Sequence, residues 1–490
     1  MGALPCDNHR RLLIPAQPSP KQDPATRVHN WEEVYLPLDL ETARREAERC
    51  LHCPDAPCQQ ACPLHNSIPE ALYLLEQGDV LGAAQTFRRT SNFPEMCGRL
   101  CPQEALCEGA CVVGFAIRPA SLGPQPPVQI GRLEAFVADY QRQLLGRWPP
   151  VEQAPPTGYA VAVVGSGPAG LVCAEELAKL GHAVTVYEAW PRPGGVLRYG
   201  IPNFKMRKEI LDAYIAHLES LGIRFVCNTF IGQHLTVDDL FQAGYHAIFL
   251  APGAPVGVRL NIPGEELAGV FAATEFLVRG NLAPEELPPS MRQPLRVGRH
   301  VVVIGGGDTS MDCVRTAIRL GAESVTLVYR RTEAEMMGRE EERRHAREEG
   351  VRFLFLAAPT RFIGEEGRVV AVELQRMELG PPDASGRRRP VPIPGALFTL
   401  PADTAVVAVG YEGEEEVIRA APGVRKGGKN LIRLREGFQT HRPGVFAGGD
   451  SIKGADLVVT AAADGRQAAQ AIHQYLLSQA KAVTAGQLQR

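Results

Sequence analysis

The pattern of apolar positions divides the chain into an N-terminal part with helical periodicity and a longer part in which apolar runs alternate with helices. The run Tyr159–Val164 predicts a buried parallel strand, followed by a glycine turn, a helix to about Leu180 and a strand over Ala183–Tyr187. The same succession returns with strands at His300–Ile304 and Val325–Tyr329. Two such βαβ units predict an α/β fold with two Rossmann-like dinucleotide-binding domains.

Later apolar runs indicate that the second domain is inserted in the first. We expect the strand Thr404–Val409 and the run at 445–450 to return to the first domain, and the proline-containing stretch 281–299 to cross between the two. The predicted boundaries are 1–147 for an N-terminal domain, 158–290 and 403–480 for the two parts of the first dinucleotide domain, and 295–402 for the inserted domain.

The N-terminal region shows no β alternation. After an extended arm over residues 1–30, helices are expected at Glu41–Arg49, at Ile68–Gln77 and over 130–140, where apolar residues share one face. A proline-rich linker at 148–157 separates this region from the first strand. The pattern therefore predicts an α-helical domain ahead of the two Rossmann-like domains.

Composition narrows the class of protein. The 490 residues carry 52 basic and 55 acidic side chains, a net charge of −3 without a basic patch, so nucleic acid is not an expected partner. No run approaches the roughly 18 apolar residues of a membrane helix, and the N-terminus lacks the apolar core of a secretory signal. We expect a cytoplasmic enzyme, because thiolate clusters persist in a reducing compartment.

Eight of the twelve cysteines form two blocks, spaced C-x2-C-x4-C-x3-C-P and C-x3-C-P-x4-C-x3-C. Each Cys-Pro step resembles the end of a ferredoxin-type run, whose thiolates hold a [4Fe–4S] cluster. Structural zinc and disulfides are the alternatives. Iron–sulfur is favoured because the rest of the chain carries two predicted dinucleotide sites. A flavin bound at such a site needs one-electron carriers as an outlet for its electrons, and zinc cannot carry electrons. The eight are Cys50, Cys53, Cys58, Cys62, Cys97, Cys101, Cys107 and Cys111.

The first glycine turn has the full dinucleotide fingerprint. It lies between a strand and a helix, and Glu188 ends the next strand. The glycines would let the backbone approach a pyrophosphate at the helix N-terminus, and Glu188 would accept hydrogen bonds from ribose hydroxyls. A purely structural turn is the alternative. The candidate residues of this turn are Gly165, Gly167, Pro168, Ala169 and Gly170.

Two later segments favour FAD over NAD at this first site. The glycine loop from Pro193 to Pro202 is suited to bring its backbone against an isoalloxazine, and Asp450 at a late strand end is suited to the ribityl chain. Standing alone, the second segment would be read as a plain β-turn. The candidate FAD contacts are Gly194, Gly195, Leu197, Arg198, Lys205, Gly449 and Asp450.

The second turn differs in its third glycine position, which is Ser310, and in the residues after its second strand. Arg330 and Arg331 follow Tyr329 where the first site has an acid. Because guanidinium groups bind a 2′-phosphate that a carboxylate would repel, we predict NADPH over NADH. A solvated arginine pair is the alternative. The candidate turn residues are Gly305, Gly307, Asp308, Thr309 and Ser310.

Together these segments resemble the small (β) subunit family of NADPH-dependent glutamate synthase, which is related to the N-terminal half of dihydropyrimidine dehydrogenase and to bifurcating ferredoxin–NADP reductase subunits. The resemblance covers about residues 23–475. It is carried by RCLHCPDAPCQQACPLHN at 49–66, EMCGRLCPQEALCEGAC at 95–111, VVIGGGDTSMDCVRT at 302–316, VYRRTEAEM at 328–336 and VFAGGDSIKGADLVVTAAADGRQAA at 445–469. The sequence departs from the family at Met336-Met337-Gly338, where Met-Pro-Gly/Ala is usual.

The resemblance implies a partition of the cluster ligands. Cys50, Cys53, Cys58 and Cys111 would hold one [4Fe–4S] cluster, and Cys62, Cys101 and Cys107 the other, with Glu134 as fourth ligand and Cys97 unliganded. It also implies a function: electrons pass from NADPH through FAD and the two clusters to the FMN of a large glutaminase-containing subunit. The rival hypotheses are a bifurcating NADH-dependent ferredoxin–NADP oxidoreductase, a stand-alone NADPH-dependent reductase, and an assembly subunit with degraded sites.

Overall fold

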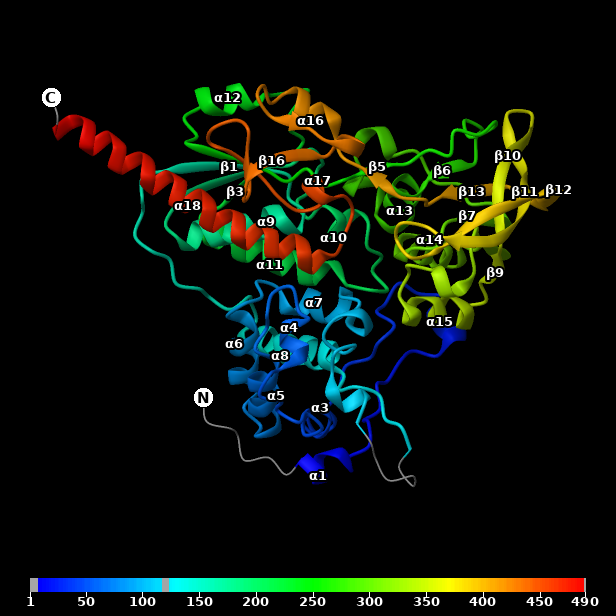
Figure 1. The fold of residues 1–490 in the computed structure, drawn as a ribbon, viewed down its shortest axis with the longest axis horizontal. Helices are drawn as coiled ribbons and strands as arrows, with labels where there is room; N and C mark the ends of the chain where they lie inside the picture. The colour runs from blue at the N-terminus through cyan, green and yellow to red at the C-terminus, as the bar shows by residue number, and fades with distance from the viewer. Residues whose placement is uncertain (1–7, 117–122, 489–490) are drawn as a thin grey trace.

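The computed structural model describes residues 8–116 and 123–488, with side chains to residue 479. Figure 1 shows a helical N-terminal domain beneath one dinucleotide-binding domain, with a second dinucleotide-binding domain beside them. None of the helices in these described ranges is long and apolar enough to cross a membrane.

The N-terminal domain is helical, as the absence of β alternation predicted; the only β pairing in its described part is the isolated bridge Lys21–Tyr35. The stretch 1–30, expected to be extended, contains two short helices in its described part, α1 (Asn8–Leu12) and α2 (Pro24–Arg27). From here on, the arm denotes residues 20–36, which lie between the helical domain and the second dinucleotide domain (Figure 1). The helices are α1 (Asn8–Leu12), α2 (Pro24–Arg27), α3 (Leu40–Ala47), α4 (Pro57–Gln60), α5 (Ile68–Glu76), α6 (Val80–Arg88), α7 (Pro94–Leu100) and α8 (Ile130–Leu145).

The first dinucleotide domain is built on an eight-stranded sheet in the order β15-β16-β17-β18-β4-β1-β2-β3, parallel from β18 to β3. Its strands are β1 (Ala160–Val164), β2 (Ala183–Tyr187), β3 (Arg224–Val226), β4 (Ala247–Leu250), β15 (Arg425–Lys426), β16 (Ile432–Glu436), β17 (Gln439–Thr440) and β18 (Val445–Ala447). Its helices are α9 (Pro168–Lys179), α10 (Val196–Tyr199), α11 (Lys208–Ser220), α12 (Val237–Gln242), α16 (Glu415–Arg419), α17 (Asp450–Lys453) and α18 (Val458–Leu488).

The long helix α18 packs along α9 before its C-terminal end projects from the body of the molecule (Figure 1). A Cβ at Gly465 of α18 would lie 2.4 Å from the carbonyl oxygen of Ala169, so only glycine permits this close approach. The helical domain shares one continuous apolar core with this first dinucleotide domain, through residues such as Phe93 and Tyr214, whose rings meet edge to face at 5.5 Å.

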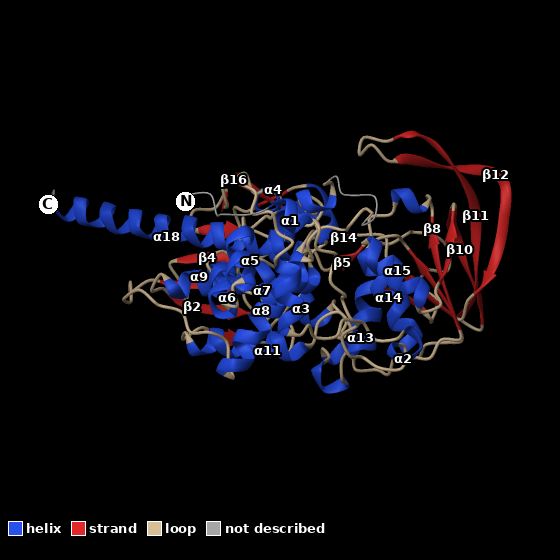
Figure 2. Cartoon of the chain, turned by 90° about the horizontal axis from the view of Figure 1, so that it is seen from below, coloured by secondary structure: helices blue, strands red, loops and turns tan. Residues whose placement is uncertain are grey.

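The second dinucleotide domain has a five-stranded parallel sheet in the order β6-β13-β7-β8-β9. A separate antiparallel sheet, β10-β11-β12, arches away from it at the end of the molecule (Figure 2). The strands are β6 (Val270–Ala272), β7 (His300–Ile304), β8 (Ser324–Tyr329), β9 (Arg352–Phe355), β10 (Ala357–Glu365), β11 (Arg368–Pro382), β12 (Arg388–Pro401) and β13 (Thr404–Val407), and the helices are α13 (Ala273–Asn281), α14 (Asp308–Arg319) and α15 (Glu340–Glu348).

Two expectations about the crossing between the domains are wrong. The strand expected at Thr404–Val409 to rejoin the first domain is β13, which pairs in parallel with β7 of the second sheet. The stretch 281–299 is not the crossing, because β6 and α13 already belong to the second domain. The chain crosses instead at β5 (Val256–Gly257) and β14 (Tyr411–Glu412), which pair with each other. An apolar run is buried equally well in either sheet, so its composition does not select the sheet.

Candidate functional site

The first four predicted cluster ligands surround one cavity. Cys50, Cys53, Cys58 and Cys111 line it together with apolar residues of α4, α5 and the start of α8. Burial raises the pKa of Cys58 to about 12 and that of Cys50 further, with the neighbouring thiols adding to the effect. Cysteine binds metal as the thiolate, so a cation is needed to keep these sulfurs ionised.

The second predicted ligand set also comes together. Cys62, Cys101 and Cys107 are buried near the Glu134 carboxylate. Burial raises the pKa of Cys62 and Cys107, the hydrogen bond with Cys97 and burial raise that of Cys101, and the Glu134 charge adds to all three shifts. Glu134, on α8, accepts a hydrogen bond from Asn66 Nδ2 at 3.1 Å. Cys97 lies within this group. Its thiol is hydrogen-bonded with that of Cys101 and accepts a hydrogen bond from the Ser91 hydroxyl at 3.8 Å.

The donor chemistry of both sets fits a soft multinuclear centre. Within the described ranges, no group of three or more His, Cys, Asp or Glu side chains converges to hold a single metal ion. The first four thiols line a common cavity instead. Clustered thiolates select iron–sulfur or zinc, and four thiols around one cavity are the ligand number that either centre takes.

The first glycine turn is shaped to admit a pyrophosphate. Gly165 has a φ of +96°, and a Cβ there would lie 2.3 Å from the carbonyl oxygen of Ala251, whereas the outer side of Gly167 meets no atom within 4 Å. Pro168, Ala169 and Gly170 begin α9, so their end of the helix faces this open side. The turn thus offers backbone N–H groups and the positive end of a helix to an anion.

Glu188 lies beside this turn at the end of β2. Its Oε2 accepts hydrogen bonds from the backbone N–H and the hydroxyl of Ser166, and its Oε1 accepts from the Trp190 N–H at 2.8 Å. Burial raises the pKa of Glu188, and these donors oppose that shift. Ser166 in turn accepts from the Gly194 N–H at 2.9 Å, so the acid, the turn and the following loop form one unit.

The two later FAD segments converge on the same turn. A Cβ at Gly195 would lie 2.6 Å from Gly167 Cα, and one at Gly449 would lie 2.8 Å from Ala169 Cβ. Asp450 begins α17 directly after this contact, and burial raises its pKa to about 6. The predicted contacts at Gly194, Gly195, Gly449 and Asp450 are therefore gathered around a single turn.

The remaining predicted FAD contacts, Leu197, Arg198 and Lys205, are buried or paired within the protein. Leu197 is fully buried, and Arg198 donates to the Pro193 carbonyl at 2.7 Å and pairs with Asp212 at 2.5 Å. Lys205 lies farther along, with its Nζ 3.0 Å from Asp312 of the second dinucleotide domain. The structure thus places Lys205 in a contact between domains, a role that its position after the loop did not reveal.

The second glycine turn repeats the first. Gly305 has a φ of +147°, a Cβ there would lie 2.2 Å from the carbonyl oxygen of Ala408, and Gly307 is open on its outer side. Ser310 is buried and contacts the same Ala408 carbonyl at 3.4 Å, so it replaces the third glycine without loss of packing. Asp308 and Thr309 begin α14, and Asp308 Oδ1 accepts from the Arg339 N–H at 2.9 Å.

The departure at Met336–Gly338 leaves the contact with this turn intact. The Gly338 N–H donates to the Gly306 carbonyl at 3.0 Å, which holds the 336–339 loop against the glycines. Met337 is 70% exposed. The residue that replaces proline in the family pattern is therefore on the surface.

The two predicted 2′-phosphate ligands have different environments. Arg330 is exposed at the end of β8. Arg331 is buried, donates to the Arg388 carbonyl at 2.7 Å and pairs with Asp383 at 2.7 Å, both on the β11–β12 hairpin. Only Arg330 presents its side chain to solvent, and sequence reasoning missed Asp383 because the hairpin loop is distant in the chain.

The fold and these sites define a class, the flavin- and pyridine-nucleotide-dependent oxidoreductases that carry an iron–sulfur domain. The family model of pyridine nucleotide-disulphide oxidoreductases matches residues 159–465, and that of dihydropyrimidine dehydrogenase domain II, 4Fe–4S cluster, matches residues 27–145. The predicted α/β fold with two dinucleotide domains and an iron–sulfur domain is thereby confirmed.

Within this class, the chain belongs to the family of NADPH-dependent glutamate synthase small chains. It is 39% identical over 479 residues to that protein of Halomonas elongata, covering 96% of this chain and 98% of the relative. For the small chain of Escherichia coli the identity is 38% over 464 residues, covering 93% and 96%. The family predicted from the motifs is confirmed.

Two further comparisons concern proteins outside glutamate synthase. The chain is 42% identical over 453 residues to the putative oxidoreductase UacF of Escherichia coli, covering 91% of this chain and 69% of the relative. A solved structure of FprA from Mycobacterium tuberculosis in complex with NADPH superposes with a TM-score of 0.57 at 24% identity, covering 67% of this chain and 86% of FprA. The FprA likeness concerns the fold.

Proposed function

We propose that the chain is the electron-input subunit of a glutamate synthase, in which NADPH gives a hydride to FAD and electrons leave singly through two [4Fe–4S] clusters to the FMN of a large subunit. The observation that carries this proposal is the presence in one chain of two glycine turns and two thiol sets, in a family of glutamate synthase small chains. Glutamine and 2-oxoglutarate chemistry belongs to the large subunit.

The first turn is the proposed FAD site. Its open glycine side and helix N-terminus hold a pyrophosphate, and Glu188 orients a ribose hydroxyl. Gly194, Gly195, Leu197 and Arg198 line the ring side of the site, and Gly449 and Asp450 line the side of the ribityl chain. No general acid or base is assigned, because the chain's task in hydride transfer is to position the two cofactors.

The second turn is the proposed NADPH site. Gly305, Gly307 and the start of α14 hold its pyrophosphate, and the exposed Arg330 binds the 2′-phosphate. Arg331 supports this site indirectly, since its guanidinium anchors the β11–β12 hairpin through Asp383.

The N-terminal thiols are the proposed cluster ligands. Cys50, Cys53, Cys58 and Cys111 hold one cluster, a partition supported by the cavity that they line. Cys62, Cys101, Cys107 and Glu134 hold the other, and Cys97 remains unliganded. Thiolate clusters of this kind suit a reducing cytoplasm, which we propose as the location.

A second candidate function is electron input to a different acceptor. The observation in its favour is the 42% identity to the putative oxidoreductase UacF, which exceeds the identity to the two glutamate synthase small chains compared above. In that case the cofactor sites are the same, and only the partner that receives the electrons differs.

The test begins with anaerobic purification and measurement of iron, sulfide, zinc and flavin. We expect two [4Fe–4S] clusters and one FAD per chain, with a visible spectrum that bleaches on addition of NADPH. Reconstitution with a glutamate synthase large subunit should then yield NADPH-dependent glutamate formation. Bleaching without glutamate formation would favour the second candidate, and a colourless zinc protein would refute both.

A further inference from the structure

Helix α14 connects the second nucleotide turn to a buried junction between domains. The helix begins directly after Gly307. It carries Asp312, Arg315 and Arg319 at spacings of three and four residues, which places them on one face. Asp312 is 6% exposed and Arg315 is fully buried. Side chains that bind this face therefore also fix the direction of the N-terminal end of α14, where the nucleotide is proposed to bind.

The first dinucleotide domain contacts this face of α14 through Phe204 and Lys205. The Lys205 ammonium lies 3.0 Å from Asp312 Oδ1 and 4.0 Å from Glu342 Oε2 of α15. The ring of Phe204 is covered by the guanidinium groups of Arg315, at 4.4 Å, and Arg319, at 4.1 Å. An ion pair and two cation–π contacts thus join the two domains at one point.

This point is continuous with the proposed flavin site. Phe204 and Lys205 follow the loop that begins at Gly195, which lies against the first glycine turn. Lys208 stabilises that loop, because its buried Nζ donates hydrogen bonds to the carbonyl of Leu197, at 2.9 Å, and to that of Ile201. A short, internally bonded segment therefore links the flavin turn to α14.

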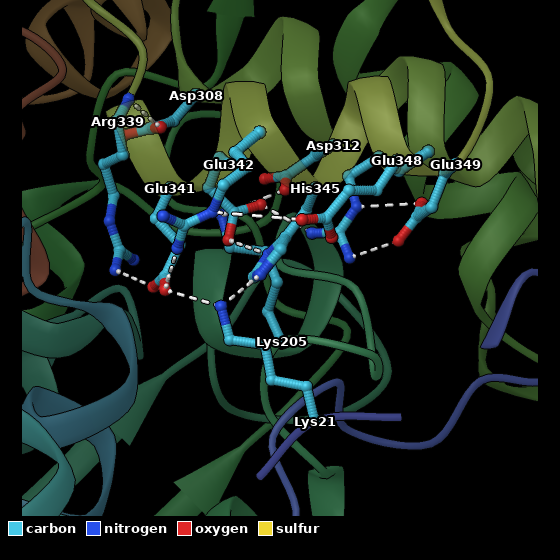
Figure 3. A network of polar contacts seen from close by, with 12 residues as sticks. Lys21, Lys205, Asp308, Asp312, Arg339, Glu341, Glu342, His345, Glu348 and Glu349 are labelled. Atoms are coloured by element: carbon cyan, nitrogen blue, oxygen red, sulfur yellow. Dashed lines mark hydrogen bonds and ion pairs between the residues drawn. The ribbon is translucent and has the colours of Figure 1, made fainter. Parts of the chain in front are cut away.

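The arm closes the same junction from the side of the helical domain (Figure 3). Arg27, 1% exposed, pairs with Glu349 at 2.8 Å and Glu348 at 2.7 Å, and Lys21 lies 3.2 Å from Glu341. Arg315 and Arg319 also pair with Glu349, both at 2.8 Å. The arm reaches the first dinucleotide domain as well: the Val34 N–H donates to the Phe204 carbonyl at 3.0 Å. We name Arg27, Lys205, Asp312, Arg315, Arg319, Glu342 and Glu349 the junction cluster.

The physical consequence of burying these charges is a single arrangement of the domains. A buried charge that loses its partner is far less stable than a paired one, so any rotation that separates Lys205 from Asp312 is disfavoured. Apolar contacts would tolerate small rotations, because dispersion and burial have little directionality. The junction cluster therefore specifies orientation more sharply than an apolar contact of the same size.

We propose that the junction cluster fixes α14 relative to the flavin loop, with Lys205 as a positioning residue for hydride transfer and Arg27 as the anchor that closes the cluster from the arm. This inference rests on the proposed function, the transfer of a hydride from NADPH to FAD. The ion pairs of Lys205 are with Asp312 and Glu342, on α14 and α15. Its effect on the reaction passes through Asp312 and the axis of α14, so nucleotide affinity and hydride transfer respond to it differently.

The test compares Lys205→Met and Arg27→Met with the wild type in the full-length holoprotein. Anaerobic stopped-flow gives the rate constant of flavin bleaching at saturating NADPH, and titration gives the dissociation constant of NADP⁺. We expect Lys205→Met to bleach about 10- to 100-fold more slowly, since a misplacement near 1 Å costs up to about 100-fold. The NADP⁺ dissociation constant should stay within about twofold, because the proposed pyrophosphate and 2′-phosphate contacts, at Gly305, Gly307 and Arg330, all lie in the second dinucleotide domain. Arg27→Met should slow bleaching less strongly and also leave the NADP⁺ dissociation constant within about twofold.

A second variant separates positioning from folding. Lys205→Met leaves the Asp312 carboxylate buried without its cation, whereas Lys205→Met/Asp312→Leu removes both charges and should regain thermal stability. We expect the double variant to remain slow in bleaching. If it regains the wild-type rate together with stability, Lys205 only neutralises Asp312 and the proposal is wrong. The matched control is Arg344→Met, which removes an exposed arginine paired within the same domain and should leave the rate unchanged.

A readout without turnover distinguishes this inference from the proposed function. Hydrogen exchange should rise at least about tenfold in residues 202–207 and α14 of Lys205→Met, but not of Arg344→Met. Unchanged exchange would overturn the positioning role even if NADPH bleaches the flavin. Failure of NADPH to bleach the wild type would instead refute the proposed function, with the exchange result still deciding whether Lys205 holds the domains together.

Discussion

Discrimination between NADPH and NADH should depend on Arg330 far more than on Arg331. Arg330 is exposed at the end of β8, beyond the second glycine turn, whereas Arg331 is buried against the β11–β12 hairpin. Replacing Arg330 with alanine removes one cation from the region where the 2′-phosphate is expected and leaves the hairpin anchored. We therefore expect Arg330→Ala to raise the KM for NADPH with little change in the KM for NADH.

The size of the effect follows from the exposure of the side chain. A hydrogen bond to a charged group contributes about 1.5–3 kcal/mol when shielded, and an exposed ion pair about 0–1 kcal/mol. A 2′-phosphate of about −1.5 to −2 charge at a partly open site should fall between these limits. At about 1–1.5 kcal/mol, the KM for NADPH rises roughly 5- to 12-fold.

The assay measures NADPH- and NADH-dependent reduction of ferricyanide by the holoprotein at fixed ionic strength. Arg352→Ala is the matched control, since this arginine is exposed at the opposite, amino-terminal end of the next strand, β9. Arg331→Ala should behave differently again: it breaks the pair with Asp383, loosens the hairpin and affects both nucleotides. Equal changes in the two KM values for Arg330→Ala, or a change no larger than that of Arg352→Ala, would refute a 2′-phosphate contact.

Three further predictions concern the clusters and the junction. Glu134→Ala should alter the EPR signal and iron content of one cluster only, because this carboxylate lies among Cys62, Cys101 and Cys107; two unchanged signals would exclude it as a ligand. Cys97→Ser should leave both clusters in place, and loss of either would show that the ligand partition is wrong. Although burial alone would raise it, Arg315 and Arg319 hold the pKa of Glu349 at about 2. Its ionised form therefore stabilises the folded protein above about pH 4.5, and this contribution is lost as the pH falls through about 2. Glu349→Gln should lower the Tm at pH 7 and progressively less so below pH 4; a pH-independent difference would contradict this assignment.

The features recovered from the sequence are those that a few neighbouring residues dictate. Gly165 and Gly305 each need a positive φ and space for a carbonyl oxygen, so the turns, the flanking strands and the helices were predictable from short motifs. The grouping of the cysteines was predictable as two blocks, but not its partition: Cys111 lies with Cys50 across sixty residues, and only the family resemblance implied that pairing.

What the sequence did not reveal depends on contacts between distant segments. Strand β13 is apolar and buried, and nothing in those four residues distinguishes pairing with β7 from pairing with β4. Arg27 and Glu349 are 322 residues apart and each is an ordinary charged residue in its local sequence. Lys205 is among the flavin contacts expected from the sequence, and its pairing with Asp312 could not be predicted because Asp312 lies in another domain.

The two interfaces of the first dinucleotide domain differ in a way that matches the two kinds of electron transfer proposed here. The interface with the helical domain is a continuous apolar core that includes the cluster thiols and residues such as Phe93 and Tyr214. The interface with the second dinucleotide domain has only a small apolar cluster in its described part, around Tyr199, Val278 and Leu287, and adds the buried, directional pairing of Lys205 with Asp312. Transfer of a hydride requires reacting atoms at about 3–3.5 Å in a defined alignment, whereas movement of single electrons between clusters forms no bond and needs no such alignment. We therefore expect substitutions of Phe93 to affect stability first, and substitutions of Lys205 to affect the hydride step first.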